Sequence, residues 1–324
     1  MIGVRTVLVT GASGFLGQFV CDDLRGRGLD VITTHRGGSV ANANDRARIY
    51  WDLEDPATLR VQDLNGIDAV VHLAARVHVM GHEALDDGYF HGPNVHATKH
   101  IAEIAAATGA SRFVYMSSIK VNGEATTVAP FTPDDRPAPE DAYGRSKLLA
   151  ERALHEIAAR TGLQAVVIRP PLVFGPGVGG NFVRMLRWVA RGWPLPLGGV
   201  TNLRSYLSAW NLADLVGTAL LHPGAAGRTL LVADGPAVST ADLLRRLARA
   251  CGRKPLLFDV PEQVMYVAAQ LTGRTQDIAR LCGSLVVDDS ATRAALGWNP
   301  PVPFDDGILR TAHWYMESAK HAKR

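Results

Sequence analysis

The chain has 324 residues, of which 47% are apolar and 20% are charged, and its net charge at pH 7 is +3. This composition is typical of a globular enzyme, and so small a net charge argues against a nucleic-acid-binding protein. No run of 18 apolar residues occurs, so we expect no membrane-spanning segment. The three cysteines form no CxxC pair and the N-terminus leads directly into a strand, which predicts a cytoplasmic protein without a signal peptide.

The first half of the chain alternates short apolar runs with longer helical patterns. This alternation predicts an α/β fold, a Rossmann-type doubly wound parallel sheet with helices on both faces. We expect strands at residues 4–10, 30–34, 48–52, 69–74, 112–116 and 165–169, and helices at 14–26, 94–108 and 143–161. Residues 1–170 would form a dinucleotide-binding domain.

After residue 170 the pattern changes to loops rich in proline and glycine, with helices expected at 181–191, 211–222 and 239–251 and a short strand at 200–208. Ser239 or Thr240 would cap the third of these helices. Residues 171–324 are expected to form a smaller, mixed α/β substrate-binding lobe, from which some segments return to the first domain.

A glycine-rich loop joins the first expected strand to the first expected helix. Gly11 would permit the tight turn, Gly14 would let the backbone approach a pyrophosphate, and Gly17 would allow the helix to pack closely on the strand. The N-terminus of the helix would offer free N–H groups to the phosphates. We expect this loop to bind a dinucleotide, with Ser13, Phe15 and Leu16 also lining the cofactor.

The end of the second strand bears on which dinucleotide is bound. An acidic residue there accepts hydrogen bonds from the ribose hydroxyls of NAD, but this strand ends Thr33-Thr34-His35-Arg36. Arg36 is placed to meet a 2′-phosphate, so NADP(H) is favoured and NAD(H) is the alternative. Asp52 and Leu53, after the third strand, are expected to contact the adenine.

Tyr143 and Lys147 lie four residues apart on an expected helix and therefore share one face. The lysine ammonium would favour the phenolate and lower the pKa of the tyrosine towards neutrality. The hydroxyl pair Ser117-Ser118 follows an apolar strand. A serine at this place would hydrogen-bond the substrate oxygen that the tyrosine protonates. Together with the glycine loop, this pattern predicts hydride-transfer chemistry.

These features resemble the extended short-chain dehydrogenase/reductase family, in its nucleotide-sugar epimerase/dehydratase group, over nearly the whole chain. The matching stretches are TGASGFLG (10–17), HLAA (72–75), Asn94 to Thr98, VYMSS (114–118), YGRSK (143–147), RPPLVFGPG (169–177) and RSYLSAWNLAD (204–214).

The resemblance implies a role for each matching residue. Tyr143 would be the catalytic acid/base, Lys147 would modulate its pKa and hold the cofactor ribose, and Ser118, rather than Ser117, would be the third catalytic residue. A UDP-sugar would be the substrate. Further cofactor contacts would come from Tyr143, Leu73, Ala74, Ala75, Pro170 and Val173, and substrate contacts from Ser118, His78, Asn181 and Arg204.

The reaction is narrowed by departures from the family pattern. Related 4,6-dehydratases carry an Asp-Glu pair after the active-site hydroxyl, where this chain has Ile119 and Lys120, so dehydration is disfavoured. The resemblance then favours NADPH-dependent reduction of a UDP-4-keto-6-deoxy-hexosamine at C4. Two alternatives stay open: a UDP-sugar 4-epimerase with bound NAD, and a sensor or scaffold that binds NADP(H) without turnover.

Two further features have less weight. His96 and His100 are spaced so that both could face one metal, but no other ligand follows at a fixed spacing, and we expect no metal site. The resemblance implies a homodimer that pairs the expected helix at 143–161, which carries Tyr143 and Lys147, with the helix at 94–108 that precedes it. Either that interface or packing onto the sheet would use their apolar residues, namely Ile101, Ile104, Ala105, Leu149, Ala153 and Ile157.

Overall fold

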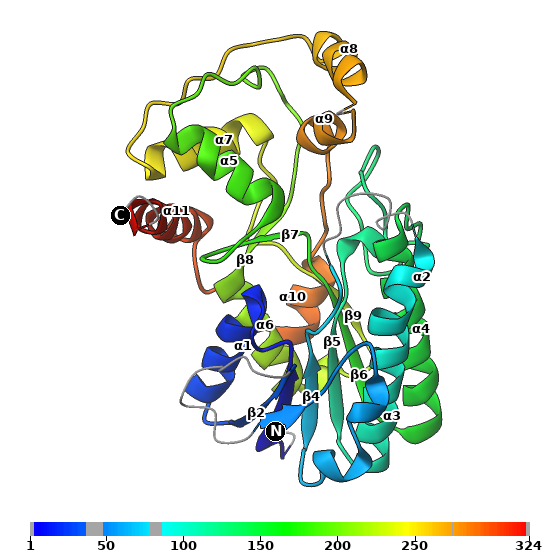
Figure 1. Cartoon of the computed structure of the whole chain (residues 1–324). Coiled ribbons are helices and arrows are strands. Elements are labelled where there is room, and N and C mark those ends of the chain that lie inside the picture. Colours follow the sequence, from blue (N-terminus) through cyan, green and yellow to red (C-terminus); the bar gives the residue numbers. More distant parts are fainter. Residues whose placement is uncertain (1–2, 37–47, 78–85, 274, 322–324) are drawn as a thin grey trace.

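The computed structural model describes residues 3–36, 48–77, 86–273 and 275–321. Figure 1 shows two parts, a lower one built on a sheet and an upper one that is mostly helical. Among the described residues, no helix combines the length and the apolarity needed to cross a bilayer.

The lower part is built on a seven-stranded sheet in which every strand pair is parallel. Its strands, in spatial order, are β3 (Arg48–Tyr50), β2 (Asp30–His35), β1 (Thr6–Thr10), β4 (Ala69–His72), β5 (Arg112–Met116), β6 (Gln164–Arg169) and β9 (Thr229–Leu231). This order confirms the expected Rossmann-type sheet. The strand order reverses between β1 and β4, where open α/β sheets bind their ligands.

Helices cover both faces of this sheet (Figure 1). Because successive residues of a strand point to opposite faces, Val7 and Val9 of β1 join one apolar core and Leu8 joins the other. The first core contains α1 (Phe15–Gly26) and α6 (Ala209–Leu221), and the second contains α3 (Ala97–Ala107) and α4 (Ala142–Thr161). Ile101, Ile104, Ala105 and Ile157 are buried in the second core, so they pack onto the sheet and are unavailable to a dimer interface.

The upper part encloses a third core. It comprises α5 (Gly180–Ala190), α7 (Thr240–Ala250), α8 (Glu262–Thr272), α9 (Thr275–Cys282), α11 (Phe304–His321) and the parallel pair β7 (Leu172–Phe174) and β8 (Tyr206–Ser208). Ser239 caps α7, since its hydroxyl accepts a bond from the Asp242 N–H at 3.0 Å. Residues 200–205, expected to be part of a strand, precede β8 outside any named strand, so that strand is limited to three residues.

Short elements connect these layers. They are α2 (Asp87–Phe90), a π-helical turn over His91–His96, 3₁₀ turns at Pro56–Thr58, Val61–Leu64 and Pro223–Ala225, η5 (Ile119–Val121) and α10 (Ser290–Leu296). The expected helix over 94–108 therefore begins as a π-helical segment, a form that is rare in proteins and frequent near functional sites. Strand β9 and helix α10 return to the sheet from beyond residue 170 (Figure 1).

Candidate active site

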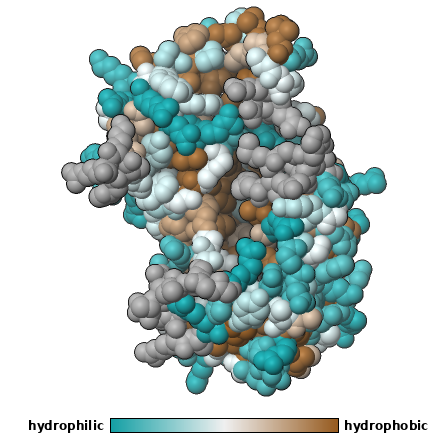
Figure 2. All heavy atoms as spheres, in the orientation of Figure 1, coloured by the Kyte–Doolittle hydropathy of each residue, from teal (hydrophilic) through white to brown (hydrophobic). Residues whose placement is uncertain are grey.

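The residues expected to act together follow the carboxyl ends of adjacent strands. Because β1, β4, β5 and β6 run parallel, the segments that follow them emerge at one edge of the sheet. These segments hold the glycine loop, Leu73 to Ala75, Ser117-Ser118 and Pro170. Figure 2 shows a recess between the two parts of the molecule, with apolar residues at its base.

The glycine loop forms a cradle that side chains would fill. Gly11 has φ +72°, and a Cβ there would lie 2.8 Å from the Ala74 backbone nitrogen; a Cβ on Gly17 would lie 2.4 Å from the Gly11 carbonyl oxygen. Helix α1 begins after Gly14, with no side chain capping its N–H groups. A pyrophosphate fits such a cradle because the helix start offers N–H donors and a partial positive charge. Ser13 is exposed, and Phe15 and Leu16 are half-buried in the first turn.

His72, at the end of β4, fixes the next loop against the glycine loop. Its Nδ1 lies 2.7 Å from the Thr10 hydroxyl and its Nε2 lies 3.0 Å from the Thr98 hydroxyl. The Thr10 hydroxyl also accepts a bond from the Ala74 N–H at 3.2 Å. Burial lowers the pKa of His72 to about 3, with Lys147 adding to the shift, so the ring is neutral. The half-buried Leu73, Ala74 and Ala75 are thereby held beside the cradle.

At the end of β2, the structure places His35 and then an exposed Arg36. The His35 ring meets the Tyr50 ring edge-on at 6.1 Å. Asp52 follows β3, and its carboxylate accepts a bond from the Glu54 N–H at 3.0 Å, while Leu53 packs on the second core. No carboxylate occurs within the last residues of β2, so this edge lacks the acid that selects NAD in related folds.

The two neighbouring serines point in different directions. Ser117 is buried and donates its hydroxyl proton to the Glu151 carboxylate. Ser118 is half-buried, accepts a bond from the Lys120 N–H at 3.3 Å, and lies close enough to Tyr143 for its hydroxyl to oppose the rise in the pKa of that residue. Only Ser118 of the pair therefore lies with the tyrosine.

Lys147 does not lower the pKa of Tyr143 in this structure, contrary to expectation. Burial raises the pKa of Tyr143 well above its usual range, the Asp141 carboxylate adds to the rise, and the Ser118 hydrogen bond opposes it only in part. Burial also lowers the pKa of Lys147 to about 7, although Glu151 opposes the change. Its ammonium donates to the Met116 carbonyl at 2.9 Å and lies 5.8 Å from the centre of the Tyr143 ring. The spacing thus indicated proximity, but burial determines both pKa values.

A buried ion pair lies behind Lys147. Arg169, at the end of β6, donates to both Glu151 oxygens at 2.9 and 2.6 Å and to the Asn122 side-chain oxygen at 2.9 Å. Both charged side chains are almost fully buried. Sequence reasoning missed this network because its members are far apart in the chain.

Asn94 links the π-helical turn to α4. Its side-chain amide donates to the Ser146 hydroxyl at 2.9 Å, and its oxygen accepts from the Arg76 N–H at 2.8 Å. His96 and His100, considered as metal ligands, have other contacts: His96 packs edge-on against His91, and His100 lies 2.8 Å from the Leu59 carbonyl oxygen.

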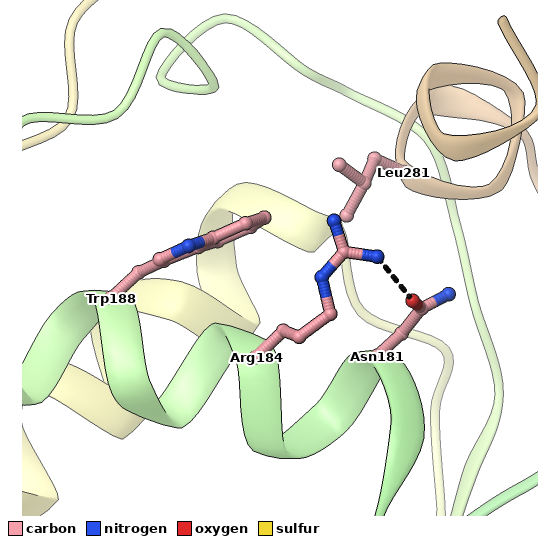
Figure 3. Close-up of a pocket in the computed structure, with 4 residues that line it drawn as sticks. All are labelled: Asn181, Arg184, Trp188 and Leu281. Atoms are coloured by element: carbon pink, nitrogen blue, oxygen red, sulfur yellow. Dashed lines mark hydrogen bonds between the residues drawn. The ribbon is translucent and has the colours of Figure 1, made fainter. Parts of the chain in front are cut away.

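The expected cofactor and substrate residues of the upper part lie on several elements. Pro170 is buried and its carbonyl accepts from the Ile119 N–H at 3.1 Å, and Val173 is half-buried in β7. Asn181 is in the first turn of α5, where its side-chain oxygen accepts a hydrogen bond from Arg184 at 3.3 Å in a small pocket that Trp188 and Leu281 also line (Figure 3). His78 lies outside the described residues.

Arg204 is hydrogen-bonded to the backbone at the C-terminal end of α9. One guanidinium nitrogen donates to the carbonyls of Arg280 and Gly283 at 3.1 and 2.8 Å. Burial lowers the pKa of Arg204, although the nearby Tyr206 and Glu124 oppose the change; the smaller influence of Arg280 adds to it.

A family model described as the NAD dependent epimerase/dehydratase family matches residues 7–233. The chain belongs to this family. The family member described here is accordingly an enzyme of the nucleotide-sugar epimerase/dehydratase type.

The chain is similar to curated relatives and solved structures over nearly its whole length. A UDP-glucose 4-epimerase of Vibrio cholerae is 38% identical over 97% of this chain and 96% of its own. A 2-alkyl-3-oxoalkanoate reductase of Stenotrophomonas maltophilia is 29% identical over 97% and 92% of the two chains. The structure of MoeE5 in complex with UDP-glucose and NAD is 26% identical with a TM-score of 0.77, over 97% of this chain and 99% of that one.

Proposed function

We propose that this family member reduces the C4 keto group of a UDP-4-keto-6-deoxy-hexosamine with NADPH, through Ser118, Tyr143 and Lys147. The observation that carries the proposal is the position of Tyr143, a half-buried residue at the start of α4 whose raised pKa keeps the phenol protonated and which lies beside Ser118. A protonated phenol beside a second hydroxyl is the arrangement that a ketone reduction needs, because the product oxygen must receive a proton.

Each of the three residues has a defined task in this reaction. Ser118 and Tyr143 would hydrogen-bond the C4 oxygen and so polarise the carbonyl group. Tyr143 would then donate its proton to the developing alkoxide. Lys147 would hold the ribose of the cofactor beside the tyrosine. A bound nicotinamide would supply the hydride.

The cofactor choice is supported by the end of β2. Arg36 is exposed and follows directly on a strand end without a carboxylate, so its guanidinium is placed to bind a 2′-phosphate by charge-assisted hydrogen bonds. Replacing Arg36 by Ala is expected to weaken NADPH binding about tenfold or more and to leave NADH binding nearly unchanged. The matched control is Arg5→Ala, which removes an exposed arginine before the amino end of β1.

A second candidate function is a UDP-sugar 4-epimerase with permanently bound NAD, as in UDP-glucose or UDP-N-acetylglucosamine epimerases. It is favoured by the Vibrio cholerae relative, which is named a UDP-glucose 4-epimerase. The same three residues would serve, with Tyr143 taking up a proton in one half-reaction and returning it in the other. An NADP(H)-binding sensor or scaffold would need none of the three.

The test begins with the protein as purified. It is denatured and the released nicotinamide nucleotide is quantified, and native protein is then titrated with NADPH and NADH. Protein without bound nucleotide that prefers NADPH, and that turns over a UDP-4-keto sugar, supports the reductase. Stoichiometric, non-exchanging NAD would overturn it in favour of the epimerase.

Two serine variants separate the catalytic hydroxyl from its neighbour. Ser118→Ala is expected to lower kcat by about 100-fold or more, because a hydrogen bond to the reacting oxygen is lost, with little change in stability. Ser117→Ala is expected to keep most activity and to lower the free energy of unfolding by about 1–3 kcal/mol, since its buried partner Glu151 loses a donor. Tyr143→Phe should abolish turnover while retaining nucleotide binding; normal turnover would exclude the proposed mechanism.

We also propose a homodimer that pairs the helical layer formed by α3 and α4. The support is Leu149, an apolar residue with an exposed fraction of 40% that shares the exposed side of α4 with Arg152 and Glu156. Sedimentation velocity tests the proposal: a dimer that Leu149→Glu dissociates is expected, and a monomer at micromolar concentration would refute it.

A further inference from the structure

Lys120 joins the segment that carries Ser118 to the helix that carries Tyr143. It lies in η5, two residues after Ser118, and its ammonium donates to the Glu124 carboxylate at 2.7 Å and to the Asp141 carboxylate at 2.5 Å. All three side chains are more than half-buried. One cation is thus shared between two carboxylates at the edge of the candidate active site.

Asp141 also holds the start of α4. Its other carboxylate oxygen accepts a bond from the Gly144 N–H at 2.7 Å, which makes it the N-cap of the helix two residues before Tyr143. A Cβ on Gly144 would lie 2.9 Å from the Lys120 carbonyl oxygen, so η5 and the first turn of α4 are in direct contact. The Lys120–Asp141 pair therefore spans the junction between the two catalytic hydroxyls.

This arrangement also controls which charges Tyr143 experiences. After burial, the Asp141 carboxylate is the main cause of the raised pKa of Tyr143. Burial would raise the pKa of Asp141 itself, but the hydrogen bonds from Lys120 and Gly144 lower it, so Asp141 is ionised. The other titratable groups around this junction are Glu124, Arg204 beside Glu124, Tyr115, Lys147 and, behind Lys147, Glu151 and His72.

We propose that Lys120 is a positioning residue for hydride transfer: by bridging Glu124 and Asp141 it fixes the first turn of α4 and neutralises the carboxylate nearest the Tyr143 phenol. The inference rests on the proposed role of Tyr143 and adds to it a residue that acts through another side chain. Lys120 stands where the related 4,6-dehydratases carry an acidic residue, so at this position the chain has the opposite charge.

The test measures the apparent pKa of Tyr143 in the Lys120→Met variant. Loss of the ammonium leaves Asp141 unscreened, and the apparent pKa in the alcohol-oxidising direction is expected to rise by roughly 0.5–1 pH unit, for carboxylate and phenol at partly exposed positions. Below that pKa the oxidation rate should fall about 3- to 10-fold. Lys99→Met removes an exposed lysine from α3 and serves as the matched control.

A second substitution distinguishes screening from other roles. Asn also caps helices, so Asp141→Asn removes the charge and keeps the cap. The double variant Lys120→Met/Asp141→Asn should return the apparent pKa to the wild-type value or below. A shift that persists in the double variant, or no shift in Lys120→Met, would overturn the proposal. Should Lys120→Met fail to fold, Lys120→Gln takes its place, because it also removes the ammonium but can still hydrogen-bond to the two carboxylates; an unchanged pKa in that variant would overturn the proposal.

A spectroscopic readout separates this proposal from the proposed function. The phenolate absorbance of each variant, minus that of the same variant carrying Tyr143→Phe, reports the pKa of Tyr143 in the nucleotide complex without turnover. If Tyr143→Phe proves fully active, the proposed function fails, whereas the effect of Lys120 on the phenol can still be measured. If activity requires Tyr143 but the pKa of Tyr143 is the same with and without Lys120, only the inference about Lys120 fails.

Discussion

Replacing Glu151 by Gln should destabilise the fold more than any comparable surface change. The Glu151 carboxylate accepts hydrogen bonds from Nε and Nη2 of Arg169. The side chains of Glu151 and Arg169 are only 3% and 6% exposed. Removing one partner of a buried ion pair typically costs about 3–5 kcal/mol. The glutamine oxygen still accepts one bond, so we expect a loss near the lower limit, about 3 kcal/mol.

The expected change in melting temperature follows from chain length. An unfolding entropy of about 2.1 cal/mol/K per residue gives about 0.7 kcal/mol/K for this chain, so a loss of about 3 kcal/mol lowers Tm by about 4–5 °C. The matched control is Glu103→Gln, which breaks the exposed 2.9 Å pair with Arg160 and should lower Tm by less than about 1.5 °C. Calorimetry of both variants is the assay. Equal melting temperatures for the two would refute the assignment of Glu151 as a stabilising buried partner.

The same substitution should also affect Lys147. Glu151 is the group that opposes the burial-induced fall in the pKa of Lys147. Without the carboxylate, the pKa of Lys147 should drop below about 7, and the ammonium should be lost at neutral pH. The acid side of the activity profile would then shift to lower pH, while Glu103→Gln should leave the profile unchanged.

Three further predictions concern stability and cofactor binding. Gly17→Ala should abolish nucleotide binding in a nucleotide titration, because its Cβ would lie 2.4 Å from a backbone oxygen. The control is Gly26→Ala in the same helix, whose Cβ would meet nothing within 4 Å; in thermal unfolding it should be neutral or stabilising by up to about 1 kcal/mol. Burial lowers the folded pKa of Lys147 to about 7, so between pH 7 and its unfolded pKa of 10.5 the unfolded chain binds more protons and stability rises with pH; Lys147→Met should lose this rise, as followed by Tm against pH. Arg112→Met should cost about 3 kcal/mol or more in denaturant unfolding, because this fully buried guanidinium donates to the Ala219 and His222 carbonyls at 2.7 Å, and an unchanged midpoint would contradict it.

The sheet and the glycine loop were predictable because their signals are local. β1, β4, β5 and β6 are continuous apolar runs, each followed by a helix or a loop, and the glycine spacing is set by contacts within a few residues. The cradle at Gly11 and Gly17 shows the close approach that the motif predicts. Strand ends differ from expectation by a few residues only.

The remaining elements depend on long-range packing. β7 and β9 have three residues each, too short to give a pattern, and they are strands only because Tyr206–Ser208 and β6 lie beside them. α8 to α11 were not assigned at all. The apolar faces of α3 and α4 suited both a dimer and the sheet, and burial of Ile101 and Ile157 decides for the sheet.

Within the candidate site, residue identity was easier to predict than electrostatics. Tyr143 and Lys147 lie together as their spacing indicated, and Ser118, which the family resemblance implied, lies beside Tyr143. The direction of the Tyr143 pKa shift was wrong, because the spacing reveals the neighbouring lysine but not the burial of both groups. The partners of Lys120 and Arg169 could not be predicted from the sequence either, because they come from other elements.

The route of the chain through β9 limits how the molecule can be divided. The chain enters the upper part through β7 and α5 before it returns to the sheet. Both α6, which covers α1, and β9, which is the last strand of the sheet, follow this segment. A fragment ending at residue 170 would expose the β6 edge and the face of α1 that α6 buries. The two parts are therefore not separable modules: cutting the chain between them should leave neither half able to fold alone, and heat or denaturant should melt both in one cooperative transition.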